Sequence, residues 1–172
     1  MDTFVEQIVR KKKTAVDWLI IFGISVAALI VSFLIWRFVY FLLPTVVLIV
    51  WGAWWVATGR NIEFEYCITN GEMDVDTIIA QRRRKRLCSI TCSKVEAYGE
   101  LSKGDFEGKK FDRTIMAAPE LNMDDNYYFI YRSKKYGRTL VIFHPDERVQ
   151  QAFFSALPRL MQIQLEKESK NG

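Results

Sequence analysis

Residues 61–80, NIEFEYCITNGEMDVDTIIA, carry the clearest fold signal in this chain of 172 residues. Apolar and polar residues alternate in the first half of the stretch, which is the period of a strand with one buried face. Asn70-Gly71 follows, and this dipeptide between alternating segments is a strong signal for a two-residue hairpin turn. Such a turn pairs Ile68 with Met73, apolar against apolar. The stretch therefore predicts a β-hairpin.

The outer face of this predicted hairpin is acidic, and a basic run follows it. The acidic residues are Glu65, Glu72, Asp74 and Asp76, and the basic ones are Arg82, Arg83, Arg84, Lys85 and Arg86. A third strand beside the hairpin places Arg84 and Arg86 opposite or diagonal to the acids, at about 0.2–1 kcal/mol per pair. Arg82, Arg83 and Lys85 are then expected at a loop tip, where an anionic lipid surface attracts each by about 1 kcal/mol. All five are candidate lipid-facing residues.

The rest of the C-terminal part predicts further strands and one helix. The strands are expected at residues 86–92, 94–101, 110–118, 126–134 and 137–144. Pro145 and two acids open a helix from about residue 145, where they suit its first turn. Its apolar stripe is Val149, Phe153, Ala156, Leu160 and Ile163. Pro158 is expected to kink the helix or to end its first half. The predicted domain thus has seven strands and a C-terminal helix.

Two apolar stretches, residues 15–36 and 38–57, precede this β-rich part. About 20 apolar residues cross roughly 30 Å of hydrocarbon, and residues 15–57 contain only two charges, Asp17 and Arg37. The stretches therefore predict a two-helix transmembrane hairpin that reverses near Arg37. The aromatic residues near its ends, typical of membrane interfaces, are Trp18, Trp36, Trp54 and Trp55.

Basic residues flank the predicted hairpin on one side. They are Arg10, Lys11, Lys12, Lys13 and Arg60. By the positive-inside rule, both termini are expected in the cytoplasm and the protein in the cell membrane as a multi-pass protein. Residues 1–14 either form a short interfacial amphipathic helix, because Val5 and Val9 are four apart, or remain a frayed basic flank. The cytoplasmic domain is expected to span residues 61–172.

Residues with catalytic potential are few. His144 is the one histidine in the chain, and the three cysteines have no metal-ligand spacing. Phosphate-binding, dinucleotide-binding and hydrolase motifs do not occur in the sequence. The sequence therefore predicts neither an enzyme nor a metal or other cofactor. The near balance of charges, with a net charge of +4, and the lack of a helix-turn-helix or stacking motif also argue against nucleic acid as a partner.

The order of elements resembles the pleckstrin-homology-like (PH-like) fold, a bent seven-stranded barrel closed by a C-terminal helix. The stretches that carry the resemblance are FEYCITNGEMDVD (64–76), RRRKRLCSITCSKVEAYGEL (82–101) and YGRTLVIFHPDERVQQAFFSAL (136–157). More narrowly, the chain resembles uncharacterised bacterial membrane proteins in which a PH-like domain follows a transmembrane hairpin. In phosphoinositide-binding PH domains, a basic loop in the first hairpin holds the phosphates. The predicted first hairpin here has the uncharged Asn70-Gly71 instead, so the resemblance implies no ligand residues.

Three functions agree with these features. The favoured one is a membrane-anchored, non-catalytic module at the inner leaflet that binds a protein partner, with auxiliary contact to anionic lipid. The alternative is an accessory subunit of a membrane complex assembled through the hairpin, whose small residues Gly23, Ala27, Ala28, Gly52 and Ala53 allow close helix packing. Such packing would also serve a homo-oligomer. A metal-dependent enzyme is the third and least supported function.

Overall fold

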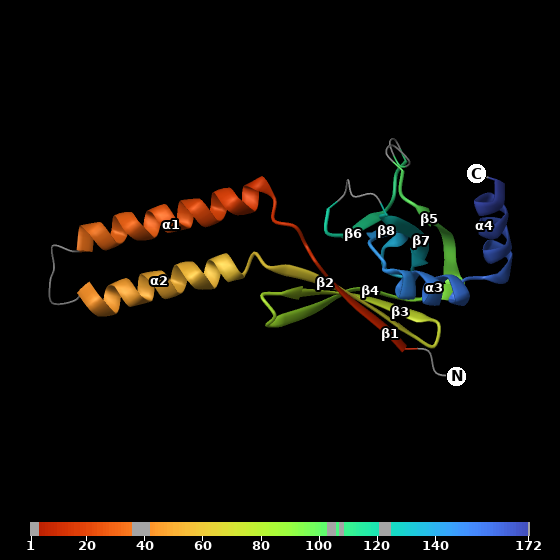
Figure 1. The fold of residues 1–172 in the computed structure, drawn as a ribbon, viewed down its shortest axis with the longest axis horizontal. Helices are drawn as coiled ribbons and strands as arrows, with labels where there is room; N and C mark the ends of the chain where they lie inside the picture. The colour runs from red at the N-terminus through yellow and green to blue at the C-terminus, as the bar shows by residue number, and fades with distance from the viewer. Residues whose placement is uncertain (1–3, 36–41, 103–105, 107–108, 121–124, 172) are drawn as a thin grey trace.

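The computed structural model describes residues 4–35, 42–102, 106, 109–120 and 125–171. Figure 1 shows an elongated molecule, with two helices at one end and a β-rich domain at the other. In chain order, the elements are β1 (Phe4–Arg10), α1 (Ala15–Ile35), α2 (Leu42–Thr58), β2 (Ile62–Thr69), β3 (Glu72–Ile79), β4 (Arg83–Thr91), the 3₁₀ helix η2 (Cys92–Lys94), β5 (Val95–Glu100), β6 (Arg113–Ala117), β7 (Tyr127–Ser133), β8 (Gly137–Phe143), α3 (Glu147–Ala156) and α4 (Arg159–Asn171).

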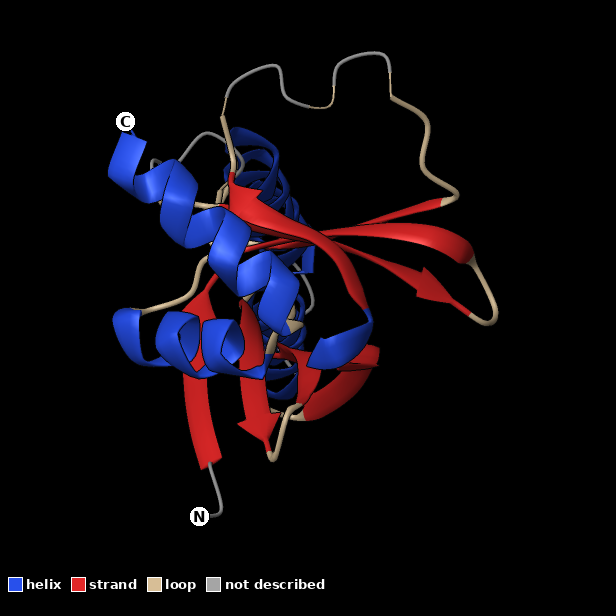
Figure 2. Ribbon diagram, turned by 90° about the vertical axis from the view of Figure 1, so that its right-hand side faces the viewer, coloured by secondary structure: helices blue, strands red, loops and turns tan. Residues whose placement is uncertain are grey.

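The strands form two sheets, and α3 and α4 lie at the end of the domain that faces away from α1 and α2 (Figures 1 and 2). The first sheet is antiparallel in the order β1-β2-β3-β4, and the second has the order β5-β7-β8-β6 with β6 parallel to β8. Across the described residues this makes eight strands instead of the expected seven. The β-rich architecture with a helical C-terminus is as expected, but the seven-stranded barrel is not.

The additional strand is β1, where the sequence predicted an interfacial helix or a frayed flank. Phe4–Arg10 pairs with β2 along its whole length, from Phe4 opposite Thr69 to Arg10 opposite Glu63. Alternate residues of β1 are exposed and half-buried, and the half-buried Val5 and Val9 pack against the core. Residues four apart share one side of a strand as well as one side of a helix, so their spacing did not distinguish the two. The β domain therefore includes residues before the apolar helices.

The apolar helices α1 and α2 are an insertion in the connection between β1 and β2, and they run side by side (Figure 1). Within α1, Ala15–Leu34 has a mean hydropathy of 2.3 and is long and apolar enough to cross a membrane. The apolar part of α2 in the described chain, Pro44–Thr58, is shorter than a full span. The expected reversal at Trp36 and Arg37 lies outside the described residues. One apolar helix near the N-terminus thus suggests membrane association, and the spanning hairpin itself is not confirmed.

The hairpin predicted at Asn70-Gly71 is confirmed, with Ile68 opposite Met73. Both turn residues have positive φ, 49° at Asn70 and 82° at Gly71, as a type I′ turn requires. It joins β2 to β3 and is therefore the second hairpin of the sheet, because β1 precedes it. The connection of the first hairpin is the helical insertion with its basic flanks.

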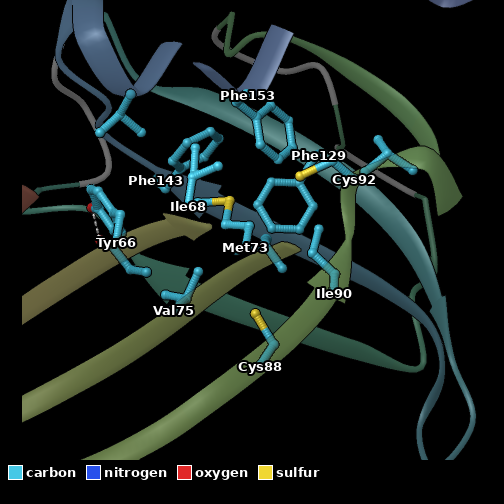
Figure 3. Close-up of a cluster of buried hydrophobic side chains, with 14 of the residues drawn as sticks. Tyr66, Ile68, Met73, Val75, Cys88, Ile90, Cys92, Phe129, Phe143 and Phe153 are labelled. Carbon is cyan, nitrogen blue, oxygen red and sulfur yellow. Dashed lines mark hydrogen bonds between the residues drawn. The ribbon is translucent and has the colours of Figure 1, made fainter. Parts of the chain in front are cut away.

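Large apolar side chains fill the space between the two sheets and α3 (Figure 3). Phe153 of α3 is fully buried, and its ring centroid lies 5.2 Å from that of Tyr98, 5.3 Å from Phe129 and 5.8 Å from Phe143. These aromatic contacts come from three strands and a helix. The C-terminal helix therefore belongs to the core of the domain.

The C-terminal helix is divided at Pro158, as expected from the proline. Asp146 caps α3 through its Oδ1, which accepts a hydrogen bond from the Val149 amide at 2.8 Å. The apolar stripe predicted beyond the proline is wrong, since Leu160 is 78% exposed and Ile163 is 42% exposed. Met161 and Leu165 pack against the core instead. A break at Pro158 resets the helical phase, so a stripe counted through the proline points the wrong way.

Candidate functional site

Two arginines of the basic run are held by the acids of the first sheet. Arg84 donates to Asp76 Oδ2 at 2.6 Å and to Glu65 Oε1 at 2.7 Å. Arg86 donates to Asp76 Oδ1 at 3.1 Å and to Asp74 Oδ2 at 2.9 Å. A bulge between Val75 and Asp76 sets the register that puts Arg86 opposite Asp76. The predicted pairing across the strands is therefore confirmed.

The surroundings of this cluster shift several pKa values. Burial raises the pKa of Glu65 above its ordinary value, and the nearby Arg84 guanidinium only partly offsets this effect. Side-chain hydrogen bonds to Asp76 raise the pKa of both Arg84 and Arg86. Because their charge is largely matched within the sheet, these two arginines are poor candidates for an external anion.

Arg82 contacts the second apolar helix instead of the sheet. Its guanidinium carbon lies 4.2 Å from the ring centroid of Trp55 and 5.3 Å from that of Trp54. Its Nη2 also lies 3.5 Å from Thr58 Oγ1, to which it donates. The turn before β4 positions it there, because Ala80 and its neighbour both have positive φ and reverse the chain beside the end of α2. A cation over an aromatic face contributes about 0.5–2 kcal/mol.

A pocket of about 640 Å³ lies at the junction between the helices and the β domain. We call it the junction pocket. It is lined by Arg10, Lys11, Lys13, Trp54, Thr58, Asn61, Ile62, Glu63, Ala80, Gln81 and Arg82. These residues come from the end of β1, the end of α2, the start of β2 and the turn between β3 and β4. Basic side chains that are distant in the sequence thus line the same pocket.

The junction pocket has more positive than negative charge. Its one carboxylate among the lining residues, Glu63, is 9% exposed and accepts a hydrogen bond from Arg10 Nε at 2.9 Å. The Lys13 ammonium lies 5.4 Å from the ring centroid of Trp18, and the Lys11 amide extends the ladder to Ile62 at 2.9 Å. In the described part of the chain, no ion pair neutralises Lys11, Lys13 or Arg82. Three cations of the pocket are therefore without a carboxylate partner there.

Two other flanking cations hold the junction together. Arg60 donates from Nε to Asp17 Oδ1 at 2.8 Å and pairs with the same oxygen through Nη2, and Asp17 is only 4% exposed. This pair joins the start of α1 to the chain that leaves α2. Lys12 turns to the other side, where its amide donates to Pro119 O at 3.2 Å and its ammonium pairs with Glu120 at 3.1 Å. Neither Arg60 nor Lys12 lines the pocket.

The remaining predicted site residues do not meet in the pocket. The expectation of Arg83 and Lys85 at a loop tip is wrong, because β4 begins at Arg83 and includes both; they are exposed there and do not line the pocket. Trp18, Trp54 and Trp55 are each more than half exposed, and Trp36 lies outside the described residues. The pairing of β1 with β2 was not predicted from the sequence, so the meeting of Lys11, Lys13 and Arg82 was not predicted either. The one signal available was that all three were candidate membrane-contacting cations, Lys11 and Lys13 as residues flanking the apolar stretches and Arg82 as a lipid-facing residue.

His144 and the cysteines have structural surroundings. The His144 Nδ1 lies 3.2 Å from Asn126 Oδ1, its amide donates to the Tyr66 hydroxyl at 3.2 Å, and its carbonyl accepts from Gln7 at 3.2 Å. Burial raises the thiol pKa of both Cys88 and Cys92 to about 12, so both stay protonated at neutral pH. In the parts of the chain that are described, no three His, Cys, Asp or Glu side chains gather in a way that could hold a metal ion. The candidate binding site is therefore the junction pocket, whose cationic side chains form a surface for an anion.

Comparison with known proteins supports the fold. The model of the family described as "Bacterial PH-like domain (DUF6106)" matches residues 1–163. The match begins before β1 and continues through both apolar helices into α4, so it also includes residues before the stretches that carried the resemblance, the first of which begins at residue 64. No curated protein and no solved structure matches the chain. The chain belongs to this family of bacterial PH-like domains.

Proposed function

We propose that this member of the bacterial PH-like family is a membrane-anchored, non-catalytic module that binds a protein partner at the inner leaflet, with auxiliary contact to anionic lipid. The observation that carries the proposal is the insertion of the apolar helices into the first hairpin of the β domain. Residues 11–14 and 59–61 are the whole of the two connections. Short connections on both strands hold the domain at the end of its anchor.

The topology of the proposed anchor follows from its charges. In this proposal both helices cross the bilayer and both termini are cytoplasmic, since the basic residues lie at the end of the helices that joins the β domain. They are Arg10, Lys11, Lys12, Lys13, Arg60 and Arg82. Each basic residue close to an anionic leaflet adds about 1 kcal/mol of attraction.

The protein partner is proposed to bind away from this junction, at exposed apolar residues. On the edge strand β1, Phe4 is 63% exposed and Ile8 is 53% exposed. On α4, Leu160 is 78% exposed. An unpaired strand edge and an apolar helix face are two common modes of protein recognition.

Site-specific cross-linking in living cells tests the proposal. A photoreactive residue is placed at Ile8 or Leu160 in the full chain, and a control is placed at Arg132, which is 77% exposed on the second sheet. We expect one discrete protein adduct from Ile8 or Leu160 and none from Arg132. The same adduct from all three positions, or lipid adducts alone, would refute a specific protein partner.

Topology is tested separately in a variant that lacks the native cysteines. A cysteine in place of Arg37 should react with an impermeant thiol reagent added outside the cell, whereas a cysteine in place of the exposed Lys94 should react only after the membrane is opened. The reverse pattern would overturn the proposed orientation. Reaction at both positions in intact cells would overturn the anchor itself.

A second candidate function, an accessory subunit held by its helices, is favoured by one observation. A Cβ atom added to Gly23 or Gly52 would meet nothing within 4 Å, so neither glycine serves the contact between α1 and α2. Glycine on an outer helix surface allows another helix to approach closely. Gly23→Leu should then displace a membrane partner without changing the fold of the β domain, and unchanged co-purification of that partner would reject this function.

A further inference from the structure

We propose that the junction pocket binds the phosphate of an anionic phospholipid headgroup, with Lys11, Lys13 and Arg82 as its cationic contacts. This proposal rests on the proposed function, because it needs the end of α2 at the level of the headgroups. It adds a defined site to what would otherwise be diffuse attraction between a basic surface and the membrane.

The charge balance of the junction singles out these three residues. The other basic residues beside the apolar helices each have an acidic partner in the described structure: Arg10 with Glu63, Lys12 with Glu120, and Arg60 with Asp17. In the basic run, Arg84 and Arg86 pair with the acids of the first sheet, whereas Arg83 and Lys85 have no ion pair among the described residues but do not line the pocket. Like charges that converge on one pocket repel one another, and a bound anion removes that repulsion. A phosphate carries the charge that the pocket lacks.

The geometry of Arg82 suits a phosphate ligand. Its guanidinium carbon lies over the rings of Trp55 and Trp54, at 4.2 and 5.3 Å from their centroids. A phosphate binds a guanidinium group through its N–H edge, so stacking and phosphate binding can occur together. The two tryptophans thus pre-orient Arg82, which lowers the entropy lost when a headgroup binds.

The position of the pocket identifies the source of the phosphate. Its wall includes Trp54 and Thr58, in the last turns of α2, and tryptophan at such a position is typical of the headgroup level. A volume of about 640 Å³ exceeds that of a bare phosphate ion and lies in the range of small-molecule pockets, about 300–1,000 Å³. Asn61 and Gln81 provide amide groups that can bind hydroxyls. This set fits a glycerol-phosphate headgroup.

Lipid binding to the purified full chain is the direct test. The protein in a neutral detergent is titrated with phosphatidylglycerol or phosphatidylcholine, and bound lipid is counted by native mass spectrometry. The test variant carries Lys11→Gln, Lys13→Gln and Arg82→Gln. The control variant loses the same charge through Arg83→Gln, Lys85→Gln and Lys94→Gln, none of which lines the pocket.

The two variants are expected to differ strongly. If each cation contributes about fivefold to affinity, the test variant should bind phosphatidylglycerol roughly 100-fold more weakly than the wild type. The control variant should stay within about threefold of the wild type, and phosphatidylcholine should bind weakly to all three proteins. Equal losses in both variants, or equal binding of the two lipids by the wild type, would overturn the proposal in favour of diffuse charge attraction.

Two further measurements make the result unambiguous. The melting temperature of each variant in lipid-free detergent shows whether folding is intact. If the test variant does not fold, the single change Arg82→Gln, at an exposed residue, replaces it. The second measurement asks whether a soluble phosphate can replace the lipid: inorganic phosphate or glycerol 3-phosphate is added to the wild type without lipid. Protection from thermal unfolding by either one at micromolar concentration would mean that the pocket takes a soluble phosphate, which would overturn the lipid assignment. A failure here leaves the anchor and the protein partner unaffected, since the topology and cross-linking experiments test those.

Discussion

Replacing the apolar helices by a turn should leave a folded soluble domain. The register of β1 and β2 permits this change, because Arg10 is opposite Glu63 and the Lys11 amide donates to Ile62 O at 2.9 Å. Lys11 and Ile62 are thus placed as the closing pair of a two-residue hairpin. Substituting residues 12–61 with Asn-Gly would supply a type I′ turn at that point. The variant keeps all eight strands and both C-terminal helices.

The matched comparison is the same domain without β1, which begins at Ile62. Removing β1 takes away the half-buried Val5 and Val9, each about 1 kcal/mol for a partly buried valine. It also removes Gln7, whose amide donates to His144 O at 3.2 Å and accepts from the Asp146 amide at 2.8 Å. These hydrogen bonds add about 1 kcal/mol each. The strand therefore contributes about 4 kcal/mol, a large share of the 5–15 kcal/mol typical of a domain.

Urea denaturation, followed by far-ultraviolet circular dichroism, measures the difference in stability between the turn-linked domain and the domain that begins at Ile62. With the slope usual for a domain of this size, a loss of about 4 kcal/mol lowers the midpoint by roughly 2–3 M urea. The turn-linked variant should unfold cooperatively, and the domain that begins at Ile62 should be partly unfolded in buffer. Equal midpoints for the two proteins would show that residues 4–10 are dispensable and that β1 does not belong to the domain.

Three further outcomes are expected, and each is measured in the turn-linked domain. Gly71→Val, at a φ of +82°, should lower the free energy of unfolding by about 1–2 kcal/mol, and an unchanged urea midpoint would contradict the turn. Asp76→Asn should lower the free energy of unfolding by about 1–2 kcal/mol. This is less than the 3–5 kcal/mol lost when a fully buried ion pair is broken, because both arginine partners of Asp76 are half exposed. An unchanged free energy of unfolding would mean that the ion cluster does not stabilise the domain. Cys67 should react with a thiol reagent at pH 8, whereas Cys88 and Cys92, buried and with pKa values raised to about 12, should react only after unfolding; fast reaction of all three would contradict their burial.

Features set by neighbouring residues were predictable from the sequence. The turn at Asn70-Gly71 and the division at Pro158 follow from backbone preferences of the residues themselves. The pairing of Arg84 with Asp76 followed once the hairpin register was known, because the third strand had few alternative positions. Each of these features depends on fewer than about twenty residues of chain.

Features set by distant residues were not predictable in this way. β1 has a strand period, but its partner β2 lies beyond the apolar helices, and a strand of seven residues gives little signal without that partner. The junction pocket depends on this pairing, because β1 is what brings Lys11 and Lys13 near Arg82. The sequence separated Arg84 and Arg86 from the rest of the basic run, but it grouped Arg82 with Arg83 and Lys85 at a loop tip. In the structure Arg82 instead lies against Trp55 and lines the pocket, whereas Arg83 and Lys85 belong to β4.

The inserted helices also determine how the β domain is oriented relative to its anchor. Two short connections, the pair between Arg60 and Asp17, and the contacts of Lys12 with residues 119–120 all link the helices to the β domain. A domain on one flexible linker would sample many orientations, whereas one joined through two adjacent strands keeps a single end toward its anchor. If the helices span the bilayer as proposed, the junction pocket stays at headgroup level and α4 stays at the far end of the domain (Figure 1). A lipid bound at the near end and a protein bound at the far end would then be held at a fixed separation, so neither would compete with the other for the same surface.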